Sequence, residues 1–76
     1  EVEVYEIIVP AEWHMKPLNL LIPHDGCITI ALTRAGRASI PSNDVILYEG
    51  DILDVSATFE GIDALRKRII DLKEGK

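Results

Sequence analysis

The side chains with metal-binding or nucleophilic chemistry are few and lie in the first third of the chain. They are Glu12, His14, His24, Asp25 and Cys27. Zinc sites are typically built from close pairs such as Cys-x-x-Cys or His-x-x-x-His, and neither spacing occurs here. Three of these residues, His24, Asp25 and Cys27, share a site only if a turn folds them together. The pattern favours a turn histidine and a buried strand cysteine that behaves as a small hydrophobe, and it predicts no metal site.

The sequence also gives little support for a catalytic role of these residues. Cys27 could pair with either histidine, but no basic residue lies beside it in the sequence to lower its pKa and form the thiolate. Carboxylates near predicted turns are better explained by solvation at the surface than by paired acid–base work; they are Asp44, Glu49, Asp51 and Asp54. We therefore predict no catalytic residue and no enzyme activity, and an enzymatic alternative requires Cys27 to react as a thiolate at neutral pH.

Phosphate-binding loops are absent, since the chain has neither Gly-x-Gly-x-x-Gly nor a Walker pattern. We therefore predict no cofactor within this chain, NAD included. Arg34 and Arg37 flank a predicted turn, where two guanidiniums could form a fork around an anion. The alternative is that both are exposed turn flanks without a ligand. Trp13 is interpreted as a packing residue or a dimer anchor, because no second aromatic lies near it in the sequence.

Composition limits the partners. The 76 residues suffice for one small domain, and the net charge of −5 disfavours nucleic acid polymers and anionic membrane surfaces. The basic run Arg66-Lys67-Arg68 is interpreted as a solvated helix face. No apolar run approaches the roughly 18 residues of a membrane span, so we predict no direct membrane insertion. The single cysteine favours a reducing compartment. Because the chain begins with Glu1 and opens directly into a strand, we expect that it was cut from a longer protein.

Hydrophobic periodicity predicts the elements that position these residues. A strand over 2–9 ends at Pro10, a short helix runs from Pro17 through Ile22, and an apolar strand covers 27–34. The remaining elements follow in chain order: a turn at Ala35-Gly36, a hairpin arm at 37–40, a break at 41–44, an extended run at 45–48, a turn at Glu49-Gly50 and a strand at 51–57.

A C-terminal helix completes the predicted fold. Thr58 is its expected N-cap, and one apolar stripe runs along it at spacings of three and four: Ile62, Leu65, Ile69 and Leu72. The order of elements indicates an α+β domain. It has a small, mostly antiparallel sheet with a hairpin, one short helix, and the C-terminal helix packed on one face.

These motifs, taken in order, resemble the TrkA-C domain family, also called the RCK C-terminal domain. The matches are Ile8-Val9-Pro10, Gly26 to Arg34, Gly36, Ile40-Pro41, Asp44, Leu47 to Val55 with Gly50-Asp51, and Leu65. Each motif alone is weak, but together they span nearly the whole chain. Two departures stand out. Met15 occupies the position of a family glycine before Lys16, with Pro17 following, and Val55 to Thr58 lacks the family's final glycine.

The resemblance implies a single regulatory domain over 1–76, located in the cytoplasm and attached to a membrane transporter or channel, most often for potassium. It implies a homodimer with a small effector, such as a nucleotide, bound between two copies near the hairpin. Carried over, the candidate ligand contacts are Arg34, Arg37, Ile40, Pro41 and Asn43. The alternative is a structural dimerisation module without a ligand, in another class of transporter such as an antiporter or anion transporter.

Overall fold

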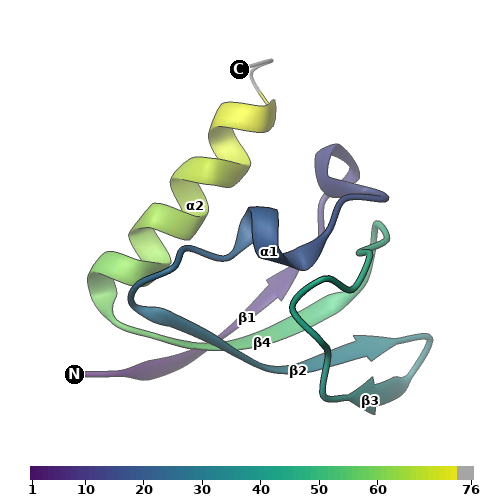
Figure 1. Ribbon diagram of the computed structural model, residues 1–76, viewed down its shortest axis with the longest axis horizontal. Coiled ribbons are helices and arrows are strands. Elements are labelled where there is room, and N and C mark those ends of the chain that lie inside the picture. Colours follow the sequence, from purple (N-terminus) through teal and green to yellow (C-terminus); the bar gives the residue numbers. More distant parts are fainter. Residues whose placement is uncertain (74–76) are drawn as a thin grey trace.

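The backbone forms a four-stranded antiparallel sheet in the order β1-β4-β2-β3 (Figure 1). In this computed structural model, which describes residues 1–73, the strands are β1 (Glu3–Ile8), β2 (Cys27–Arg34), β3 (Arg37–Ser39) and β4 (Ile52–Ala57). The helices are η1, a 3-10 turn over Ala11–Trp13, then α1 (Leu18–Leu21) and α2 (Phe59–Lys73). The predicted fold class is confirmed, and the two α-helices lie on the same side of the sheet.

The core lies between this side of the sheet and the helices. Alternate residues of β4 point into it, so Leu53, Val55 and Ala57 are buried and meet Ile62 and Leu65 of α2. The predicted helix cap is confirmed, because the Gly61 amide donates to the Thr58 Oγ1 at 3.0 Å. The cap fixes the point at which β4 turns into α2.

A bulge in β2 explains how this strand serves the core. Strict alternation would put Cys27 and Leu32, five positions apart, on opposite faces of the sheet. Between Thr29 and Ala31 the register with β4 shifts by one residue, which makes Ile30 the extra residue. As a result Cys27 and Leu32 are both buried. The predicted strand over 27–34 is confirmed, whereas its bulge was not foreseen.

The extended run at 45–48 does not join the sheet. It pairs with the segment before α1: the Met15 amide donates to the Leu47 carbonyl at 2.7 Å, and the Leu18 amide to the Val45 carbonyl at 2.8 Å. Met15 adopts a left-handed φ of 66° there. Met15 is the residue that replaces the glycine of the resembling family, so the backbone keeps a conformation that glycine adopts without strain.

Gly61 lies in the first turn of α2, where a glycine weakens a helix. A Cβ at this position would overlap the carbonyl oxygen of Gly26, so the close approach of two backbones requires the glycine. The same Gly26 carbonyl accepts a hydrogen bond from the Thr58 amide at 2.9 Å. The turn before β2 and the start of α2 are therefore locked together.

Within residues 1–73 the other side of the sheet carries no helix (Figure 1), and we call it the open face. The pairing register places the following residues on it: Val4, Glu6, Ile8, Ile28, Ala31, Thr33, Ala38, Ile52, Asp54 and Ser56. No helix in the described part of the chain is long and apolar enough to span a bilayer.

Candidate functional site

An ion pair joins the hairpin to the turn before β4. The guanidinium of Arg34 donates from Nε to Asp51 Oδ1 at 3.0 Å and from Nη2 to Oδ2 at 2.7 Å. Asp51 is only 4% exposed and accepts a further hydrogen bond from the Tyr48 amide at 2.9 Å. Asp51 thus binds a turn amide, and the expectation that it is a solvated surface carboxylate is wrong.

The charges of this pair hold each other in place. Burial raises the pKa of Asp51. The hydrogen bonds from Arg34 and Tyr48 and the nearby positive charge lower it by more than burial raises it, so the pKa lies below its usual value. The hydrogen bond to Asp51 raises the pKa of Arg34 above its already high value. Asp51 stays ionised, and Arg34 is its counter-charge.

Two rings extend this cluster to the 3-10 segment. The Arg34 guanidinium carbon lies 4.7 Å from the centre of the Tyr48 ring, and the Tyr48 and His14 rings meet edge-on with centres 5.5 Å apart. His14 Nδ1 accepts a hydrogen bond from the Glu49 amide at 2.9 Å. Arg34 also donates to the Ile46 carbonyl at 2.9 Å. The cluster therefore ties β2, the loop over 46–51 and the segment after η1 together.

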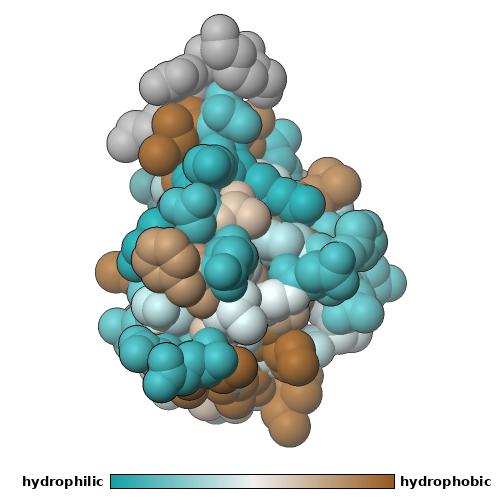
Figure 2. Space-filling model, turned by 90° about the vertical axis from the view of Figure 1, so that its left-hand side faces the viewer, coloured by the Kyte–Doolittle hydropathy of each residue, from teal (hydrophilic) through white to brown (hydrophobic). Residues whose placement is uncertain are grey.

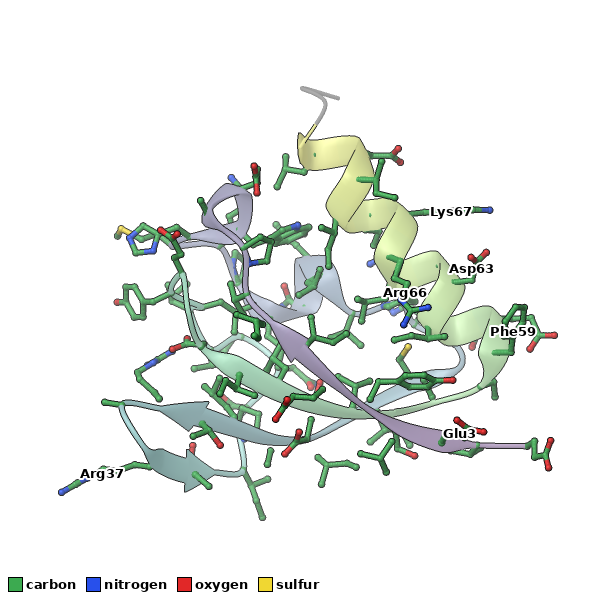
Figure 3. The ribbon with its side chains drawn as sticks, turned by 180° about the vertical axis from the view of Figure 1, so that it is seen from behind. Glu3, Arg37, Phe59, Asp63, Arg66 and Lys67 are labelled. Atoms are coloured by element: carbon green, nitrogen blue, oxygen red, sulfur yellow. The ribbon has the colours of Figure 1, made fainter. Side chains whose placement is uncertain are left out.

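The two arginines of the predicted fork have different surroundings. Arg34 is committed to Asp51, and an anion that captured it would leave Asp51 buried without its cation. Arg37 is exposed and points away from the hairpin (Figure 3). The structure therefore identifies Arg34 as a positioning residue for the loop over 46–51 and leaves Arg37 as the accessible cation of the hairpin.

A cavity of about 310 Å³ lies between the α1 segment, the start of β2 and the loop after β3. Its walls combine neutral polar groups with apolar ones: Leu18, Asn19, Ile22, Pro23, His24, Cys27, Ile28, Thr29, Pro41 and Asn43. Thr29 Oγ1 is buried and has no hydrogen-bond partner in the described part of the chain. A second hollow, of about 290 Å³, shares His24, Cys27 and Ile28 with the first.

The structure divides the five candidate contacts into two places. Pro41 and Asn43 line the cavity, while Arg34 and Arg37 lie at the opposite end of β2, beside the hairpin turn. Ile40, between them in sequence, is 88% exposed. The cavity contacts contributed by Asn19, His24 and Thr29 were missed, because nothing in the sequence indicates that α1 and the loop around 43 come together.

The remaining reactive groups are accounted for by structure. Cys27 is buried, and burial raises the pKa of its thiol, an effect that the charge of Arg68 partly offsets. No group of three metal-ligating side chains occurs among the described residues. Trp13 is buried inside the chain against α2 rather than displayed at the surface, so the packing interpretation is correct and the dimer-anchor interpretation is not.

The sheet order, the capping of α2 at the end of β4, the β2–β3 hairpin and the Gly50-Asp51 turn define a small α+β domain. The TrkA-C domain family matches residues 3–70, and the chain belongs to this family. Its members are regulatory domains of ion transport systems and are generally not enzymes.

Comparison with solved structures agrees with this assignment. A protein described as "Structure of RCK domain with cda" superposes with a TM-score of 0.68 at 27% sequence identity, covering 86% of this chain and 94% of that one. No curated protein matches the chain.

Proposed function

We propose that the chain is a cytoplasmic regulatory domain of a potassium transport or channel system. It forms a homodimer, binds a small effector and gates its membrane partner through the dimer. The observation that carries the proposal is the TrkA-C match over residues 3–70, together with a cavity that is lined by two of the predicted contacts, Pro41 and Asn43. The similar structure, an RCK domain with cda, supports ligand binding by this fold.

The cavity suits a neutral, hydrogen-bonding part of an effector. Asn19, Asn43 and the unpartnered Thr29 hydroxyl offer donors and acceptors, and prolines and aliphatic side chains supply flat apolar walls. A cavity of this size holds only a small ligand or part of a larger one. An effector that extends out of the cavity towards Ile40 and Arg37 would meet a second copy there, and its binding would favour one dimer arrangement over another.

The test is sedimentation equilibrium of the chain, repeated with mononucleotides, cyclic dinucleotides and divalent cations. We expect the dimer to tighten with one of these ligands and expect Asn43→Ala to weaken that response. Ser42→Ala is the matched control, because the Ser42 hydroxyl bonds only the neighbouring Asp44 carboxylate at the surface. A monomer at every concentration and with every ligand would overturn the proposal.

One observation favours the second candidate, a ligand-free structural dimerisation module of an antiporter or anion transporter. Arg34 is held by Asp51, so the hairpin lacks a free pair of guanidiniums for an anionic effector. A dimer whose dissociation constant is unchanged by every ligand would support this function instead. No catalytic step is proposed for either candidate.

A further inference from the structure

The open face is unusually apolar for a sheet surface that no element of the chain covers. Val4 and Ile8 of β1 are each 64% exposed, and Ile28 of β2 is 71% exposed. Figure 2 shows a group of hydrophobic atoms at the lower side of the molecule, beside a hydrophilic group, and smaller hydrophobic spots elsewhere on the surface. Large apolar side chains that gather on one exposed face of a protein mark interaction surfaces.

Two carboxylates lie in the middle of this apolar surface. Glu6 and Asp54 are direct cross-strand partners on β1 and β4. Like charges placed opposite each other destabilise a sheet. Neither carboxylate forms a salt bridge within the described residues, and none of the open-face residues is a lysine or an arginine. The pair therefore repels itself and lacks a cation to relieve the repulsion.

This charge pattern argues against a second copy as the occupant of the open face. Two copies packed face to face would enclose four carboxylates and no cation, and desolvating unpaired charges costs several kcal/mol for each ion. The area of the open face also argues against a second copy. With four strands about 4.8 Å apart and six residues at about 3.3 Å along β4, the face measures roughly 400 Å². That area alone matches weak encounters rather than stable dimers.

We propose that the open face binds a segment of another polypeptide that carries arginine or lysine between aliphatic side chains. The cation would bridge Glu6 and Asp54, and the aliphatic groups would cover Val4, Ile8 and Ile28. This surface shares Ile28 with the cavity in which the effector was placed, but the inference does not depend on the effector or on the dimer. Binding would be weak and would decrease with added salt, because the carboxylates are partly exposed.

The experiment uses two synthetic peptides of equal length on the isotope-labelled chain. One has two arginines alternating with leucine and isoleucine, and in the other both arginines are glutamine. Amide NMR titration should show the arginine peptide shifting the signals of Val4, Glu6, Asp54 and Ser56. The double variant Glu6→Gln/Asp54→Asn should weaken the arginine peptide at least about threefold, as expected for two partly exposed ion pairs. It should bind the glutamine peptide no more weakly than the natural chain does.

A second double variant controls for net charge. Glu60→Gln/Asp71→Asn removes two exposed carboxylates from α2 and should leave the affinity for the arginine peptide unchanged. Equal weakening by the two double variants would show a general charge effect and overturn the proposal. So would equal binding of the two peptides, or open-face shifts that grow with chain concentration alone, because the latter would identify a second copy as the occupant.

Discussion

Replacing Arg34 with methionine tests whether the ion pair holds the loop over 46–51. The change keeps an unbranched side chain but leaves Asp51, which is 4% exposed, without its cation. Two charge-assisted hydrogen bonds, at 3.0 and 2.7 Å, are lost. Each is typically worth about 1.5–3 kcal/mol. The Arg34 side chain is 41% exposed, so water competes for it and roughly half of that sum is discounted. We expect a loss of about 1.5–3 kcal/mol in the free energy of unfolding at pH 7.

The pH dependence of the free energy of unfolding tests the same ion pair more specifically. The pKa of Asp51 is lowered in the folded state, so its ionised form adds stability above its unfolded pKa, and this contribution is lost as the pH falls through the lower folded value. The difference between the natural chain and Arg34→Met should therefore be full at pH 7 and contract as the pH falls through the acidic range in which Asp51 takes up its proton. Urea unfolding followed by circular dichroism across this range measures it.

Arg37→Met is the matched control for this experiment. It makes the same substitution on the facing residue of the hairpin, where Arg37 is exposed and has no hydrogen-bond partner within the described residues. Its expected effect is within about 0.5 kcal/mol. The reasoning would be refuted by equal losses for the two variants, or by an Arg34→Met loss that stays constant from pH 7 to pH 2.

Three further outcomes are expected. Gly61→Ala should destabilise the chain by about 3 kcal/mol in urea unfolding, because its Cβ would overlap the Gly26 carbonyl; an unchanged midpoint would contradict the close approach. Met15→Gly should stabilise by up to about 1 kcal/mol, seen as a higher melting temperature, since Met15 has a φ of 66°; a lower temperature would show that its side chain matters more than the strain. Cys27 should react with a disulfide reagent at neutral pH far more slowly in the folded chain than in urea, because burial both shields the thiol and raises its pKa, and fast reaction when folded would restore the enzymatic alternative.

Local patterns in the sequence identified the elements of the sheet well. The β-branched run in β2, the Ala-Gly turn and the Thr58 cap depend on neighbouring residues, so each could be predicted with a physical reason. The turn is a clear instance, because Ala35 and Gly36 take φ values of 51° and 77° as a tight two-residue hairpin loop requires. The cap formed by Thr58 likewise depends only on the amide of Gly61, three positions away in the sequence.

The parts of the site that were missed depend on contacts between distant residues. The sequence around Asp51 indicates a carboxylate in an exposed turn. Asp51 can be buried because it forms an ion pair with Arg34, which is 17 residues away in the sequence. The pairing of Met15 with Leu47 joins the predicted extended run at 45–48 to a segment that has no strand pattern, so this partner could not be predicted. The cavity arises only once the loop with Asn43 has folded against the start of β2. In each case the local signal was neutral and tertiary packing decided the outcome.

Ile28 connects the two surfaces for which binding is proposed. It lines the cavity, and its place opposite Ser56 in the register also puts it on the open face. It lies two residues before the bulge residue Ile30, where the ladder between β2 and β4 is interrupted and local shifts meet less resistance. An effector in the cavity and a segment on the open face would therefore contact the same strand end. If the binding of either ligand moves Ile28, thermodynamic linkage requires the effector and the segment to change each other's affinity for the domain by the same factor. This route from effector to partner needs no movement of the rigid Arg34–Asp51 cluster, which lies at the far end of the strand.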